Sequence, residues 1–232
     1  MLHHRKIWFI TGISSGLGRA LAEAVIESGD FVIGTFRTEK QAAAFSEKNA
    51  ENAYALRVDV TNSDDIKQAF TEISQKFGRL DVLVNNAGFG MAGAIEETSL
   101  AETRELFEAN FFGALQVTQA ALPLMRTQKS GHIIQISSHG GFKAMPGFGI
   151  YNASKFALEG FSEALAAEVA PLGIRLTIVE PGPFRTKFAG NGFRLAAKTI
   201  EDYSGTAGVF RQRIKGVDGK QEGDPQKAAE AI

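Results

Sequence analysis

The eight residues T-G-I-S-S-G-L-G, at positions 11–18, decide the fold. They follow an apolar run at 7–10 that predicts a strand, and they lead into a helical pattern at 17–28. Glycines at such a junction allow a tight turn and let the backbone approach a pyrophosphate at the helix N-terminus. The spacing is G-x-x-x-G-x-G instead of G-x-G-x-x-G, and a plain turn is the alternative. The position between strand and helix favours phosphate binding by Gly12, Ser14, Ser15, Gly16, Leu17 and Gly18.

Strand-sized apolar runs and helical patterns alternate up to residue 179. The strands are predicted at 7–10, 31–36, 54–58, 82–84, 133–136 and 176–179, and the helices at 17–28, 39–49, 64–77, 102–125 and 151–169. This order predicts an α/β fold: one Rossmann-like, doubly wound parallel sheet with helices on both faces. At 232 residues, the whole chain (1–232) fits one domain.

The alternation of strand and helix patterns stops at residues 183–223, a segment that we call the lid. This segment holds glycines and phenylalanines but few strand signals. A long segment without regular pattern inside a compact domain is more often functional than a linker, so we expect it to cover a substrate site. Asp224-Pro225 then predicts a new helix with Pro225 at its first position.

The composition argues against several classes of function. Basic and acidic residues almost balance, 25 against 26, and no basic stripe stands out, so neither nucleic acid nor an anionic membrane surface is an expected partner. Cysteine is absent and the four histidines lack metal-ligand spacing, so no metal site is expected. No signal peptide or membrane span is recognised, and a cytoplasmic enzyme is the expectation.

Tyr151 and Lys155 stand four residues apart in Y-N-A-S-K. On a helix this spacing places both side chains on one face, about 5–6 Å apart at Cβ. A nearby ammonium favours the phenolate, so the pKa of the phenol is expected to fall below its ordinary value of about 10. Such a tyrosine suits acid or base catalysis on a hydroxyl/carbonyl pair. A solvated pair on a helix surface is the alternative.

The end of the second strand discriminates between the nicotinamide cofactors, because an acidic residue there binds the ribose 2′-hydroxyl of NAD. Here no acid precedes Glu39, and Arg37 together with Ser14 suits a 2′-phosphate. NADP is therefore the expected cofactor and NAD the less favoured one; a solvated arginine is the alternative for Arg37.

Two further strand ends offer cofactor contacts at the carboxyl edge of the sheet. Asp59 and Val60 follow the third strand, where the adenine would lie, and Asp59 equally fits a helix cap. Asn86, Ala87 and Gly88 follow the fourth strand, where an ordinary Asn/Gly turn is the alternative.

Taken together, these motifs resemble the short-chain dehydrogenase/reductase (SDR) family. The resemblance runs from Lys6 to about Thr186 and again near Asp224, through the motifs at 11–18, 59–60, 85–88 and 181–186, Asn110, Ser138 and Y-N-A-S-K. The stretches at 35–38 and 137–141 are similar to hydroxysteroid- and retinol-dehydrogenase-like members, and are shared by many bacterial oxidoreductases of the ketoreductase kind. Members finish with a last helix and a seventh strand, so most of that helix and the strand are expected to be missing here.

The resemblance implies a role for each motif residue. Tyr151 would be the general acid or base, and Lys155 would lower its pKa and bind the nicotinamide ribose. Ser138 would hold the substrate oxygen and Asn110 would support a water chain to Lys155; a strand-end cap and a helix break are their local alternatives. The nicotinamide end would contact Pro181, Gly182 and Thr186.

The expected reaction interconverts a hydrophobic ketone or aldehyde and its alcohol by NADP(H)-dependent hydride transfer. The alternative is a non-catalytic NADP(H)-binding sensor or regulator on the same fold. A small hydrophobic substrate suits an apolar pocket built from the loop residues Phe89, Met91, Phe142, Met145, Phe148, Phe184 and Phe188. These side chains equally fit packing of the lid against the sheet.

The two long predicted helices carry small and aromatic residues along one side. They are Ala109, Phe112, Gly113, Gln116 and Ala120 on one helix, and Phe156, Ala164 and Ala167 on the other. In the resembled family the equivalent helices pair across a twofold axis. A homodimer is therefore expected, and a tetramer is a further possibility.

Overall fold

The computed structural model describes residues 5–190 and 192–232. Its main sheet has six parallel strands in the order β3-β2-β1-β4-β6-β7. They are β1 (Ile7–Ile10), β2 (Phe31–Phe36), β3 (Ala53–Arg57), β4 (Val82–Asn85), β6 (Gly131–Ile136) and β7 (Ile174–Val179). The strand order reverses between β1 and β4, the switch point at which doubly wound sheets bind ligands. The predicted α/β fold, with all six strands, is confirmed.

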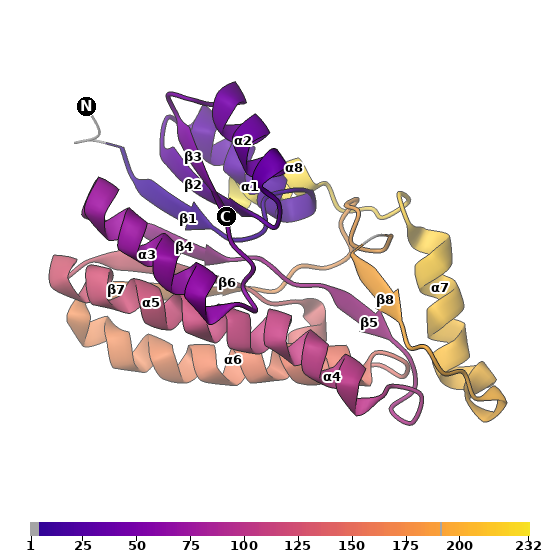
Figure 1. Ribbon diagram of the computed structural model, residues 1–232. Coiled ribbons are helices and arrows are strands. Elements are labelled where there is room, and N and C mark those ends of the chain that lie inside the picture. The colour runs from indigo at the N-terminus through magenta and orange to yellow at the C-terminus, as the bar shows by residue number, and fades with distance from the viewer. Residues whose placement is uncertain (1–4, 191) are drawn as a thin grey trace.

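Helices cover both faces of this sheet (Figure 1). One layer holds α1 (Gly16–Glu27), α2 (Glu39–Lys48) and α8 (Pro225–Ala231), which packs against α1. The other layer holds α3 (Ser63–Phe77), α5 (Gly113–Gln128) and α6 (Gly149–Val169). The prediction of helices on both faces is therefore confirmed.

The strands are apolar on both sides because each helix layer buries one face of the sheet. Phe9 of β1 and Leu83 of β4 lie in the cluster that includes α3 and α5, whereas Ile10 and Val84 lie in the cluster that includes α1 and α2. All four side chains are 0% exposed. Burying one such side chain contributes about 1.5–3 kcal/mol to the stability of the fold. A shift of either strand by one residue would move several of these side chains to the wrong face of the sheet and lose their contributions together.

The helix expected at 102–125 is divided in the structure. Helix α4 (Leu100–Phe107) is followed by a π-helical segment, Glu108–Phe112, before α5 begins. Ser99 and Glu102 start α4 with a capping box: each side chain accepts a hydrogen bond from the backbone N–H of the other residue. The sequence carries no helix-breaking residue before Gly113, which is why its pattern predicts one continuous helix.

The lid, in which the sequence shows few strand signals, contains short regular elements in the structure. The lid contains β8 (Phe193–Leu195), which pairs in parallel with β5 (Gly90–Ala92), and the helix α7 (Val209–Val217). Figure 1 shows β5, β8 and α7 grouped at one end of the molecule, beyond the main sheet. Three-residue strands give almost no periodic signal in a sequence. Helix α8 begins where predicted, with Asp224 as its N-cap.

Candidate active site

The glycine-rich turn at 11–18 connects β1 to α1. Gly12 and Gly16 adopt positive φ angles of 71° and 63°, which other residues rarely tolerate. Gly18 is required by space, since a Cβ there would lie 2.7 Å from the carbonyl oxygen of Gly12. Three glycines thus fold the turn tightly against the helix.

The first turn of α1 has the properties of an anion site. Its N-cap, Ser15, makes no side-chain hydrogen bond to the helix, and no acidic residue lies in the turn. The free backbone N–H groups and the helix dipole therefore favour a phosphate. Ser14 and Ser15 are exposed and Leu17 is half-buried beside them. A Cβ at Gly16 would lie 3.4 Å from Thr186, so that side chain covers the same turn. These residues fit a dinucleotide pyrophosphate.

A cavity of about 480 Å³ opens beside this turn. Its lining comes from α1, the lid and the start of α8, and includes Ser14, Ser15, Gly16, Arg19, Arg185, Thr186 and Lys187. The guanidinium of Arg185 donates to the carbonyl oxygens of Gln221 and Glu222, both at 2.9 Å. The Pro181 carbonyl accepts from the His139 N–H at 3.0 Å, while the neighbouring Gly182 is exposed. Both ends of the 181–186 motif are therefore fixed.

Thr11 joins the carboxyl ends of β1 and β4. Its hydroxyl oxygen accepts from the backbone N–H groups of Asn86 and Ala87 at 2.9 and 3.0 Å. The Asn86 amide donates back to the carbonyl oxygens of Thr11 and Gly12 at 2.8 and 3.1 Å. The predicted Asn86, Ala87 and Gly88 motif is thus held against the glycine-rich turn. Thr11 itself was not predicted as a site residue, because a buried threonine ending a strand gives no distinct signal.

The residues predicted for the adenosine end lie where two strands end. Arg37 is exposed directly after β2. Asp59 accepts from the N–H and the hydroxyl of Thr61 at 2.9 and 2.8 Å. Because Asn62 caps α3, the helix-cap alternative for Asp59 is wrong. Val60 is half-buried against the start of α5.

Ser138 and Tyr151 converge beside Gly140. A Cβ at Gly140 would lie 3.4 Å from Ser138 Oγ and 3.3 Å from Tyr151 Cε1. Ser138 follows β6 and also accepts from the Gly140 N–H at 3.0 Å, so it caps a short turn as well as facing the tyrosine. Burial raises the pKa of Tyr151 to about 12, and a hydrogen bond with Ser138 acts in the opposite direction. The lowered pKa expected for this phenol is wrong for this structure.

Lys155 lies one helical turn after Tyr151 and is 6% exposed. Its ammonium donates to the carbonyl oxygen of Ile136 at 2.8 Å and lies 6.0 Å from the centroid of the Tyr151 ring. Burial lowers the pKa of Lys155 to about 8, and the charge of Glu159 opposes this. Desolvation thus disfavours the charged form of both predicted catalytic groups, which explains why the phenol is not made more acidic.

Glu159 is a residue near the site that the sequence reasoning missed. Burial raises the pKa of its carboxyl group, and the positive charge of Lys155 opposes this shift. Its position four residues after Lys155 on the same helix is the signal that would have found it.

Asn110 connects the π-helical segment to the loop after β4. Its Oδ1 accepts from the Phe89 N–H at 3.0 Å, and its Nδ2 donates to the Phe89 carbonyl at 2.9 Å and to Ser154 Oγ at 3.3 Å. A Cβ at Gly88 would lie 2.8 Å from Asn110 Oδ1, so the 85–88 motif passes directly over this side chain. Asn110 is 1% exposed, and the hydrogen bonds of its side-chain amide link α6 to this loop.

Two phenylalanines contact the ring of Tyr151 and two more pack on the first of them; we call the four the aromatic cover: Phe148, Phe188, Phe193 and Phe210. Phe148 stacks on Tyr151 with ring centroids 4.1 Å apart and planes at 12°. From the lid, Phe188 meets the Tyr151 ring edge-on at 6.0 Å, while Phe193 and Phe210 lie 5.6 and 4.8 Å from Phe148. Tyr151 is only 3% exposed beneath them.

The predicted pocket residues divide into two groups. Met91, Met145 and Phe89 pack with the aromatic cover. Phe142 is 56% exposed and packs against His139, and Phe184 pairs with the strand-like segment at Gly223. Phe193 and Phe210 were not predicted, because they belong to the short lid elements that give no sequence pattern.

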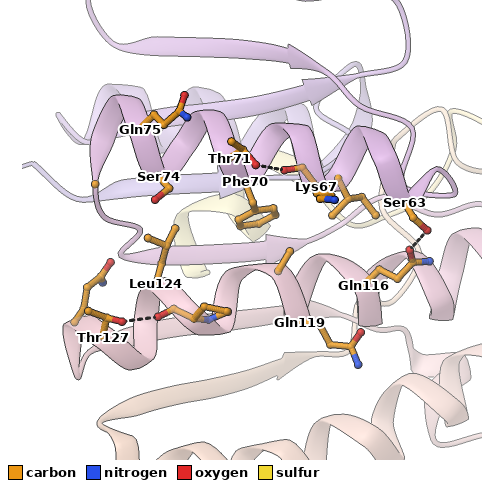
Figure 2. Close-up of a pocket in the computed structure, with 15 residues that line it drawn as sticks. Ser63, Lys67, Phe70, Thr71, Ser74, Gln75, Gln116, Gln119, Leu124 and Thr127 are labelled. Atoms are coloured by element: carbon orange, nitrogen blue, oxygen red, sulfur yellow. Dashed lines mark hydrogen bonds between the residues drawn. The ribbon is translucent and has the colours of Figure 1, made fainter.

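A groove of about 1040 Å³ lies away from these residues, between α3 and α5 (Figure 2). Its lining is mostly uncharged, and the Ser63 hydroxyl bonds Gln116 across it at 2.5 Å. None of the predicted site residues lines the groove, so its size does not mark the catalytic centre.

Within residues 5–190 and 192–232, no cluster of three His, Asp or Glu side chains is placed to hold a metal ion. In the same part of the chain, no helix has the length and apolar character to cross a membrane.

Residues 6–194 match the family model described as short chain dehydrogenase. The chain belongs to the short-chain dehydrogenase/reductase family. The SDR chain is 41% identical over 228 residues to the oxidoreductase BOA17 of Botryotinia fuckeliana, covering 98% of this chain and 83% of that protein. It is 45% identical over 186 residues to the 3-ketodihydrosphingosine reductase of Bacteroides thetaiotaomicron, covering 80% of this chain and 66% of that protein.

A solved short-chain dehydrogenase from Streptomyces avermitilis superposes on this SDR with a TM-score of 0.93. The two are 44% identical, over 100% of this chain and 84% of the other. The predicted family, and with it NAD(P)-dependent oxidoreductase activity, is therefore confirmed. The roles of the individual residues remain predictions.

Proposed function

We propose that this SDR is an NADP(H)-dependent reductase of hydrophobic ketones or aldehydes, in which Tyr151 protonates the carbonyl oxygen. The observation that carries the proposal is the convergence of Ser138 and Tyr151 beside Gly140, with Lys155 buried one turn behind the phenol. When bound at the glycine-rich turn, the nicotinamide cofactor would supply the hydride.

Tyr151 is suited to give a proton. With its pKa raised to about 12, the phenol is neutral at physiological pH and carries the proton that a forming alkoxide requires. Ser138 supplies a second hydroxyl donor to the same oxygen. Two fixed donors aimed at an oxygen that gains charge stabilise the transition state more than the ground state.

Lys155 and Asn110 would support this proton transfer. The Lys155 ammonium, held by the Ile136 carbonyl, stabilises the phenolate left after transfer, because its charge lies in a region of low dielectric. Asn110 fixes the start of α6 through Ser154, directly beside Lys155.

The aromatic cover supports a hydrophobic substrate. Its rings and the nearby Met91 and Met145 form an apolar environment around the Tyr151 ring. The relative from Bacteroides thetaiotaomicron is described as a ketone reductase, which agrees with a carbonyl substrate. A non-catalytic sensor on this fold would not need a buried tyrosine and lysine beside a second hydroxyl, so we favour the enzyme.

A Tyr151→Phe variant tests the proton-donor role. It keeps the ring that stacks on Phe148 and removes only the hydroxyl, so the fold and cofactor affinity should persist. General acid catalysis contributes about a hundred- to ten-thousandfold, and kcat with a hydrophobic ketone and NADPH should fall by that range. Tyr54→Phe, a tyrosine of β3 outside the site, is the matched control. Equal turnover by Tyr151→Phe and the parent would refute the assignment, and cofactor binding without turnover by the parent would favour the sensor.

An Arg37→Asp variant tests cofactor choice. Arg37 is proposed to bind the 2′-phosphate of NADP(H) by charge-assisted hydrogen bonds, each contributing about 1.5–3 kcal/mol. NADPH affinity should therefore fall about ten- to a hundredfold, while NADH affinity holds or rises. Fluorescence titration measures both dissociation constants, with Arg104→Asp as a control for the change in net charge. Equal dissociation constants of the parent for NADPH and NADH would contradict the assignment.

We further infer a homodimer through α5, α6 and the π-helical segment. Phe112 and Phe156 are 41% and 44% exposed, and Ala164 and Ala167 are exposed on α6. Aromatic and small residues exposed together on helices are typical of interfaces. Sedimentation equilibrium at micromolar concentration should give about twice the 25.0 kDa chain mass. A Phe112→Glu, Phe156→Glu double variant should sediment as a monomer, and a monomeric parent would refute the dimer.

A further inference from the structure

Glu97 lies in the turn after β5, outside every recognised motif, and is 3% exposed. Its carboxylate connects this turn to two separate parts of the lid. Oε1 accepts from the Ile200 N–H at 2.8 Å. Oε2 accepts from the Arg211 guanidinium of α7 at 2.6 Å and from the Ala94 N–H at 2.8 Å. Arg211 also donates to the hydroxyl of Thr199 at 2.9 Å, which closes the network.

Burial distinguishes this ion pair from the pair that Arg194 of the lid forms with Glu105. The side chains of Glu97 and Arg211 are 2% and 13% exposed, against 61% and 51% for Glu105 and Arg194, although both pairs meet at 2.6 Å. Exposed pairs contribute little, whereas a buried charge that loses its partner is strongly destabilised. Burial opposes ionisation of Glu97, but its hydrogen bonds and Arg211 together lower the pKa of its carboxyl group.

A line of packed side chains leads from this pair to the site. Phe210 precedes Arg211 on α7, and its ring lies 4.8 Å from Phe148, which stacks on Tyr151 at 4.1 Å. The lid also touches the loop that carries Phe148, since a Cβ at Gly147 would lie 2.9 Å from the Cα of Ala207. A displacement of α7 would therefore remove the packing of Phe210 on Phe148.

We infer that Glu97 and Arg211 are a positioning pair: they hold α7 so that Phe210 keeps Phe148 stacked on Tyr151 and shields the phenol from water. The inference rests on the proposed function, because Tyr151 is the group whose surroundings the pair controls. Neither residue touches the reacting atoms. Their effect is to set how often the lid opens and how dry the phenol remains while it is closed.

A Glu97→Gln variant tests the inference without reference to activity. The change keeps the side-chain shape but removes the charge that holds Arg211. Amide hydrogen exchange in residues 199–217 should accelerate about ten- to a hundredfold, the loss expected from one charge-assisted hydrogen bond, while exchange in β1 and β4 stays unchanged. Glu105→Gln makes the same chemical change at the exposed pair and should leave lid exchange at the parent's rate. Equal lid exchange in Glu97→Gln and Glu105→Gln would overturn the inference.

The catalytic consequence is tested with a graded pair of variants. Arg211→Met removes the positive charge that pairs with Glu97. Arg211→Lys keeps a positive charge at this position but lacks the planar guanidinium with its several N–H donors. For a hydrophobic ketone, kcat should fall about tenfold or more in Arg211→Met and recover in part in Arg211→Lys, with the NADPH dissociation constant unchanged. Parent-like kcat in Arg211→Met would overturn the positioning role. If the parent itself reduces no ketone, the proposed function fails, and the exchange experiment still decides whether the pair anchors the lid.

Discussion

The exclusion of water from Tyr151 and Lys155 is the constraint on which the site depends. Burial pushes the pKa of the phenol up to about 12 and that of the ammonium down to about 8, so each group is held toward its neutral form. A neutral phenol is a proton donor, and the ammonium gains most from a nearby negative charge when one forms. The proposed proton transfer from Tyr151 rests on this neutral phenol and on the adjacent hydroxyl of Ser138.

The glycine-rich turn and the residues around Tyr151 come from different strands and helices of the fold. The parallel sheet brings the ends of β1 and β4 together, and Thr11 and Asn86 fix the glycine-rich turn between them. The proposed catalytic residues come from the end of β6, from α6 and from the π-helical segment, which Asn110 links to the loop after β4. From the lid, Phe188 contacts the Tyr151 ring, and Phe193 and Phe210 pack on Phe148, which stacks on that ring. The sheet thus positions the proposed site residues, and the lid lowers the dielectric constant around the Tyr151 phenol.

Much of this arrangement was predictable because periodicity and glycine spacing are local properties. All six strands of the main sheet follow from the apolar runs and the glycine-rich turn, whereas the grouping of Asn110, Ser138, Tyr151 and Lys155 was implied by the resemblance to the family. The direction of the Tyr151 pKa did not follow, because burial depends on residues far away in the sequence. Phe193, Phe210 and the Glu97–Arg211 pair were missed for the same reason: their partners lie on other segments, and their own elements are short.

Ionisation of Tyr151 tests the account most directly. The chain has three tyrosines, so the near-ultraviolet difference between the parent and Tyr151→Phe, recorded across pH, isolates the phenolate of this one residue. Circular dichroism at each pH verifies that both proteins stay folded. The account predicts no difference signal as the pH passes 10, with phenolate forming only as it nears about 12. A Tyr151 phenolate that forms at or below pH 10 would contradict the desolvated, neutral proton donor on which the mechanism stands.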